Sequence, residues 1–176
     1  MALTSQIKRN RLRWSRFQRS LSLNPVTTPS DALPRIDEHA VVVDADRDAT
    51  WAACQRVVAS SFGSVGRTAR LLGCEDTVAS GPRPLTAGST LPGFHVEVAD
   101  PGKTLALAGG HRFSDYALIF RLEGRGNGAT TVRAETRAKF PGVKGGIYKT
   151  FVIRTRGHVL VTRRLLGAMK QRAECT

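Results

Sequence analysis

The longest helix-like run of the chain, residues 146–174, directly follows a series of segments in which apolar and polar residues alternate. Its apolar face recurs at steps of three, four and seven residues, which places these side chains on one side of a helix. They are Ile147, Phe151, His158, Val161, Leu165 and Met169. A helix of this kind after antiparallel strands buries its apolar face against them. The order predicts a sheet that curves around one long helix, an arrangement that usually encloses a ligand cavity.

The segments before this helix predict one early strand, two short helices and then a run of strands. Strands are expected at residues 39–44, 75–80, 93–99, 103–113, 116–123 and 129–140, with turns rich in glycine and proline between them. Asp46 is expected to cap a helix that carries Trp51. Ser64 is expected to cap a second helix over residues 65–72, which ends at Gly73.

One hairpin can be tested for the facing of its side chains. A two-residue turn at Ser114 and Asp115 pairs Phe113 with Tyr116 across the hairpin. Because side chains alternate between the two faces of a strand, the apolar residues of both strands then share one face. They are Leu105, Leu107, Leu118, Phe120 and Leu122, and His111 lies on the same face. This face is expected to meet the helix.

The last strand alternates between two kinds of side chain. Val132, Ala134, Thr136, Ala138 and Phe140 alternate with Arg133, Glu135, Arg137 and Lys139. This pattern predicts one apolar face and one charged face in water. The residues at 134, 136 and 138 are small, which predicts unfilled space beneath the helix. The alternative is that the helix packs closer to the sheet at this point.

The net charge of +13 gathers near the two ends of the chain. Residues 1–36, which are basic and rich in serine and proline, are expected to form a disordered tail, and residues 37–176 the domain. The cations of the tail are Lys8, Arg9, Arg11, Arg13, Arg16 and Arg19. They are candidates for weak contact with an anionic membrane or a nucleic acid, and such a start is also typical of organellar transit peptides.

The three cysteines argue for reduced thiols. Cys54, Cys74 and Cys175 are widely spaced and form no C-x-x-C pair, so neither a zinc site nor a disulfide framework is expected. No metal and no cofactor are expected, and a cytoplasmic location is the simplest expectation. The sequence also lacks an uninterrupted apolar stretch of the roughly 20 residues that a membrane-spanning helix requires.

The order of elements resembles the START-like, polyketide cyclase-like and lipid-transfer superfamily, often called SRPBCC proteins. The resemblance covers roughly residues 38–174 and is carried by residues 101–107, 111–122 and 134–142, which lead into Tyr148 and the last helix. It implies an α+β helix-grip fold, in which a curved antiparallel sheet wraps around the long C-terminal helix and two short helices follow the first strand. It also implies an internal cavity for a hydrophobic molecule, and leaves the chemistry open.

Three functions follow from these features. The first is binding or transport of a lipid, polyketide or quinone-like molecule by a monomer or weak dimer. The second is a cyclase or dehydratase-type enzyme in which His158, His111 and Tyr116 position an enolisable substrate, although the sequence holds no catalytic signature. The third is binding of a polyanion or membrane surface through the basic tail and helix. The residues expected to line the cavity are Trp51, Leu107, Phe113, Tyr116, Leu118, Phe120, Ala134, Thr136, Phe140, Phe151, Thr155 and His158.

Overall fold

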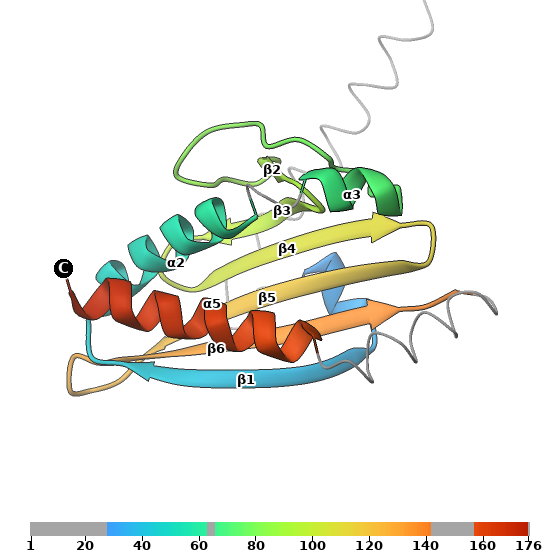
Figure 1. The fold of residues 1–176 in the computed structure, drawn as a ribbon. Helices are drawn as coiled ribbons and strands as arrows, with labels where there is room; N and C mark the ends of the chain where they lie inside the picture. The colour runs from blue at the N-terminus through green and yellow to red at the C-terminus, as the bar shows by residue number, and fades with distance from the viewer. Residues whose placement is uncertain (1–27, 63–65, 142–156, 176) are drawn as a thin grey trace, which may run out of the picture.

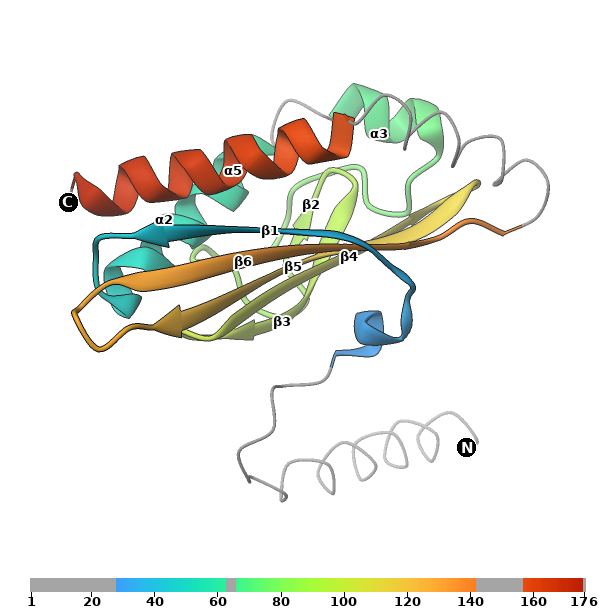
Figure 2. The ribbon, with the colours of Figure 1, turned by 90° about the horizontal axis from the view of Figure 1, so that it is seen from below.

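The computed structural model describes residues 28–62, 66–141 and 157–175. Their strands form one antiparallel sheet in the order β1-β6-β5-β4-β3-β2. The strands are β1 Arg35–Val43, β2 Thr90–Leu91, β3 Phe94–Asp100, β4 Thr104–His111, β5 Ser114–Gly124 and β6 Thr130–Lys139. The helices are η1 Pro29–Ala32, α2 Arg47–Ser61, α3 Gly66–Leu72 and α5 Gly157–Glu174. Helices α2, α3 and α5 cover one face of the sheet, and η1 lies on the other (Figures 1 and 2).

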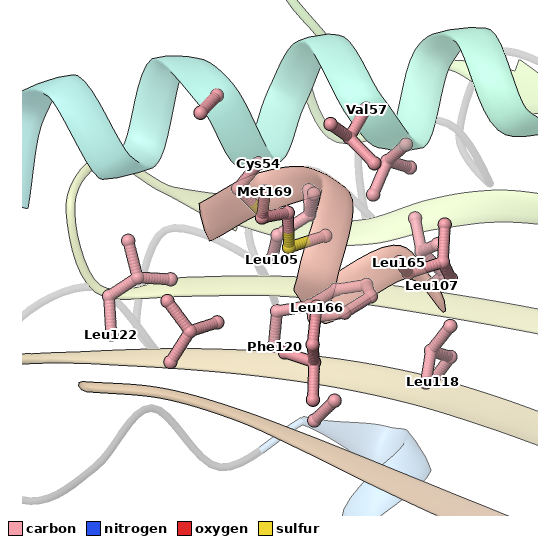
Figure 3. Close-up of a cluster of buried hydrophobic side chains, with 14 of the residues drawn as sticks. Cys54, Val57, Leu105, Leu107, Leu118, Phe120, Leu122, Leu165, Leu166 and Met169 are labelled. Atoms are coloured by element: carbon pink, nitrogen blue, oxygen red, sulfur yellow. The ribbon is translucent and has the colours of Figure 1, made fainter. Parts of the chain in front are cut away.

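The hydrophobic core lies between the sheet and the two long helices. Buried residues of α2 and α5 meet those of β4 and β5 there, as Figure 3 shows. Helix α2 begins as predicted, because Asp46 Oδ1 accepts a hydrogen bond of 2.7 Å from the backbone N–H of Ala49. Cys54 of the same helix is fully buried, and burial raises the pKa of its thiol to about 12. The predicted sheet with a terminal helix across it is confirmed.

The expected elements around α3 are found only in part. Gly73 follows α3 with a φ of 71°, and the N–H of Cys74 bonds to the carbonyl of Ala69, so Gly73 ends this helix as predicted. The strand predicted at 75–80 is wrong, since in the described structure its backbone bonds to Gly110 and Gly93 separately and forms only one isolated bridge, between Ser80 and Thr90. Ser64, and residues 146–156 of the expected long helix, lie outside the described residues.

The turn between β4 and β5 differs from the predicted turn at Ser114 and Asp115. Arg112 and Phe113 form the turn, and His111 pairs with Ser114. The two registers differ by an even number of residues, and the period of a strand is two, so every side chain keeps its face. Leu105 and Phe120, for example, are paired and belong to the core beneath α5.

The charged face of β6 was expected to lie in water, and this expectation is wrong. Residues 28–34, which were expected to belong to the tail, fold back over this face, with η1 on it (Figure 2). Glu135 is only 8% exposed and lies 2.9 Å from Arg137. Asp31 of η1 bonds to Arg121 of β5 at 2.8 Å. The charges of the strand therefore form a half-buried ion network with the segment that covers them.

The ion network around Asp31 is expected to make the unfolding free energy depend on pH in the acid range. Burial by itself raises the pKa of Asp31, but the hydrogen bond from the N–H of Thr28 and the charges of Arg121 and Arg137 outweigh it and hold the pKa below its ordinary value. A carboxyl group with a lowered pKa stabilises the fold at neutral pH, and this contribution is lost as the pH falls through the lowered pKa. Asp31→Asn is therefore expected to cost about 2 kcal/mol of unfolding free energy at pH 7.

The measurement is urea unfolding of the wild type and the variant at pH 7 and at several values below pH 4. The difference between the two proteins should shrink toward zero as Asp31 becomes protonated, because the protonated side chain resembles asparagine. Glu123→Gln is the control, since Glu123 pairs with Arg133 at 3.4 Å but its side chain is 58% exposed. A difference for Asp31→Asn that stays constant down to pH 2 would contradict the prediction.

Candidate functional site

A cavity of about 370 Å³ lies between the sheet, α3 and the first turns of the described part of α5. The sheet supplies Tyr116, Leu118, Thr136 and Ala138, while α3 supplies residues that include Leu72. The lining is mostly apolar. Such a volume and such a lining are typical of sites for small organic molecules.

Small side chains on β6 make room for the cavity. Ala138 is paired with Tyr116, and Thr136 with Leu118, so in both pairs a large side chain on β5 faces a small one. Further along the strand Ala134 is paired with Phe120, and both are fully buried. There α5 lies directly on the sheet and fills the space, so the cavity is confined to the end of the sheet beneath α3.

The residues that the sequence assigned to the cavity divide into two groups. Those that line it are His111, Tyr116, Leu118, Thr136, Phe140 and His158. Leu107, Phe120 and Ala134 do not, because they are fully buried in the core beneath α5. Trp51 packs against the same core from α2, and Phe113 lies in the turn between β4 and β5. These five assignments to the cavity wall are corrected accordingly.

Phe151 and Thr155 lie outside the described residues, as do the six cations of the tail. The sequence interpretation also missed the contribution of α3, which supplies Thr68, Ala69 and Leu72 to the lining. A helix of seven residues shows less than two full turns of apolar periodicity, which is too little to predict what it covers.

One polar group of the cavity surrounds Tyr116. Its hydroxyl donates a hydrogen bond of 2.7 Å to the carbonyl of Gly93, and the thiol of Cys74 lies 3.7 Å from the hydroxyl oxygen. The ring of Phe94 packs edge-on against that of Tyr116, with 5.1 Å between centroids. The side chain of Tyr116 is thus held against the turn before β3, and its hydroxyl proton is used in a hydrogen bond within the protein.

His111 stands beside this tyrosine, with 5.5 Å between the two ring centroids. Its Nδ1 accepts a hydrogen bond of 3.1 Å from the N–H of Phe113, and its Nε2 lies 3.3 Å from the hydroxyl of Ser114. Burial lowers the pKa of His111, against the opposing charge of Asp115, so the ring is neutral at pH 7. A neutral ring with these partners carries its proton on Nε2.

A second polar group joins β1 to α5. Asp37 Oδ2 lies 3.1 Å from Nε2 of His158 and 3.4 Å from Nε2 of His39. All three side chains are about four-fifths buried, and Asp37 is paired with Thr136 of β6. His158 and Thr136 both line the cavity, so this group stands at its wall. Asp37 and His39 were not assigned to the site from the sequence.

Two further properties concern the described ranges as a whole. In these ranges no three or more histidine, cysteine or acidic side chains are grouped so that they could hold a metal ion. None of the helices among the described residues has the length and apolar character to cross a membrane.

No protein-family model and no curated protein matches the chain. Solved structures do, at low sequence identity. A norcoclaurine synthase variant from Thalictrum flavum, in complex with a transition state analogue, has 12% identity and a TM-score of 0.50, over 80% of this chain and 96% of that one. Zhui, an aromatase/cyclase from Streptomyces, has 13% identity and a TM-score of 0.48, over 81% and 94%. CalU16 from Micromonospora echinospora has 17% identity and a TM-score of 0.40, over 82% and 92%.

Proposed function

This chain has the helix-grip fold, and we propose that it binds a hydrophobic small molecule in the cavity beneath α3 and α5. The observation that carries the proposal is the cavity itself, with about 370 Å³ of space in a mostly apolar wall. Burying an apolar guest there removes its surface from water at roughly 25 cal/mol per Å². A lipid, a polyketide or a quinone-like compound would all gain from this effect.

The proposed function can be tested by a substitution that places a large side chain in the cavity. Ala138 lines the cavity and its side chain is buried, so Ala138→Phe places an aromatic ring in the space that the guest needs. We expect the wild type to bind the neutral fluorescent probe N-phenyl-1-naphthylamine saturably, and the variant to bind it at least about tenfold more weakly, since tenfold is only 1.4 kcal/mol. Fluorescence titration measures both.

The matched control is Ala168→Phe, which adds the same ring at an exposed position of α5. This variant should bind the probe like the wild type. Circular dichroism melts of all three proteins show whether the fold is kept. Unsaturable binding by the wild type, or equal affinity in the folded Ala138 variant, would refute the proposed function.

A second candidate function is an enzyme of the cyclase or dehydratase type. The observation in its favour is that His111, Tyr116 and His158 line one cavity. The norcoclaurine synthase of similar fold is an enzyme by name. Against this candidate, the proton of Tyr116 is committed to Gly93, and both nitrogens of His111 face protein partners. Binding alone requires none of these bonds to break, so it is the better supported function.

A further inference from the structure

A group of polar side chains lies at the cavity wall where β1 and β6 meet α5. They are Asp37 and His39 on β1, Thr136 on β6 and His158 on α5, and we call them the β1–α5 cluster. Within the described residues, seven buried side-chain nitrogen or oxygen atoms have no hydrogen-bond partner, and five of them belong to this cluster. These five are Asp37 Oδ1 and Oδ2, His39 Nε2, Thr136 Oγ1 and His158 Nδ1. Oδ2 of Asp37 and Nε2 of His39 lie 3.4 Å apart without the geometry of a hydrogen bond. Since buried polar atoms are nearly always hydrogen-bonded, the unused capacity for one more polar group lies with Oδ1 of Asp37, Oγ1 of Thr136 and Nδ1 of His158.

The position of Asp37 decides which nitrogen of His158 carries the proton. Oδ2 of Asp37 lies 3.1 Å from Nε2, and a carboxylate attracts the proton of a neutral imidazole to the nitrogen nearest to it. His39 turns its own Nε2 to the same oxygen at 3.4 Å. A proton on Nε2, beside this carboxylate, leaves Nδ1 of His158 with a lone pair for which the described residues supply no donor.

We propose that the β1–α5 cluster is the polar end of the ligand site, and that it selects a ring compound bearing a hydroxyl group, whose O–H donates to Nδ1 of His158. The proposal rests on the proposed function, because His158 and Thr136 line the same cavity. The hydroxyl of Thr136 can donate in turn to the oxygen of the guest. Asp37 acts as a positioning residue, since it holds the proton on the far nitrogen of His158.

The charge of the cluster disfavours other guests. An anionic guest would meet the carboxylate of Asp37 in surroundings of low dielectric, where like charges repel strongly. A ketone or an ether has no proton to give to Nδ1. An apolar ring with a neutral hydroxyl, such as a phenol or a naphthol, avoids both penalties.

The experiment compares three guests of nearly the same size by titration calorimetry: 2-naphthol, 2-methoxynaphthalene and naphthalene. The wild type should bind 2-naphthol about tenfold more tightly than the other two, because a buried acceptor that gains a donor contributes about 1 kcal/mol or more. Asp37→Asn should reduce this preference to about twofold or less, since an amide no longer fixes the proton on Nε2. His158→Phe, which keeps a ring at this position but has no acceptor, should lose the preference, so that its affinities for the three guests differ by about twofold or less.

The matched control is Asp76→Asn. Asp76 also pairs with a histidine, His95, at 3.0 Å, but neither residue lines the cavity. This variant should keep the tenfold preference. Nitrogen-15 NMR of the histidine rings supplies a readout that a merely structural role would not move. His158 should be protonated on Nε2 in the wild type, and the Nδ1-protonated form should appear in Asp37→Asn.

The outcomes separate this inference from the proposed function. Equal affinity of the folded wild type for all three guests would overturn the inference and leave the function standing. Absence of binding of every guest would overturn both. A tenfold preference that survives in both Asp37→Asn and His158→Phe would also overturn the inference, since the hydroxyl would then be recognised elsewhere.

Discussion

Phe120→Ala is expected to lower the free energy of unfolding by about 4 kcal/mol. The ring is fully buried in the middle of β5, where Leu105 of β4 and Ala134 of β6 are its neighbours in the sheet. Leu166 of α5 lies near it on the helix side (Figure 3). The sheet fixes the backbone on both sides, so the surroundings cannot collapse into the space that the ring leaves.

Urea denaturation followed by circular dichroism measures this loss. Phe113→Ala is the matched control, because it removes the same ring from the turn between β4 and β5 and should cost about 1 kcal/mol or less. The register predicted from the sequence placed both rings on the face toward the helix. Equal losses for the two variants would favour that register over the observed one.

The faces of the hairpin could be predicted from the sequence, but its turn could not. Alternation assigns Leu105 and Phe120 to the same face in every register that differs by an even number of residues. The choice of turn rests on local residue preferences, and Ser114 with Asp115 is the more typical turn pair than Arg112 with Phe113. Pairing along the whole of β4 and β5 overrides that local preference.

The covered face of β6 shows a second feature that could not be predicted from the sequence. The alternation of Arg133, Glu135 and Arg137 indicates which side chains point away from the helix, but it carries no information on what lies beyond them. The segment that covers them, residues 28–34, has the composition of a tail and meets the strand from about a hundred positions away in the chain. Such a contact depends on tertiary structure alone.

The sequence predicted His158 and Thr136 of the β1–α5 cluster but missed Asp37 and His39 on β1. The helical spacing placed His158 on the apolar face, and the structure places it at the cavity wall. Asp37 and His39 carried a usable signal as well, because they alternate with the same period as Val41 and Val43 and so share their face. The predicted strand began only at residue 39, and Asp37 was assigned to the first residues of the domain instead.

Gly109→Ala is the other substitution for which a large effect is expected, at about 3 kcal/mol of unfolding free energy. A Cβ atom on Gly109 would lie 2.3 Å from the carbonyl oxygen of Gly93 and 2.7 Å from Cε2 of Tyr116. The first of these is backbone and cannot turn aside as a flexible side chain does. Gly109 pairs with Tyr116, and that same carbonyl accepts the hydrogen bond of the tyrosine hydroxyl. The methyl group therefore forces apart two parts of the cavity wall and breaks the bond between them.

Thermal and urea unfolding of Gly109→Ala measure the loss of stability, and titration with N-phenyl-1-naphthylamine measures the damage to the cavity. Gly124→Ala is the control, because it adds the same methyl group to β5 at a point where no atom lies within 4 Å of it. A general intolerance of the sheet for alanine would destabilise both variants equally and contradict the steric explanation. We expect Gly109→Ala alone to be unstable and to bind the probe weakly. The close approach of Gly109 in β4 to the carbonyl of Gly93 then stabilises the fold and also maintains the shape of the cavity.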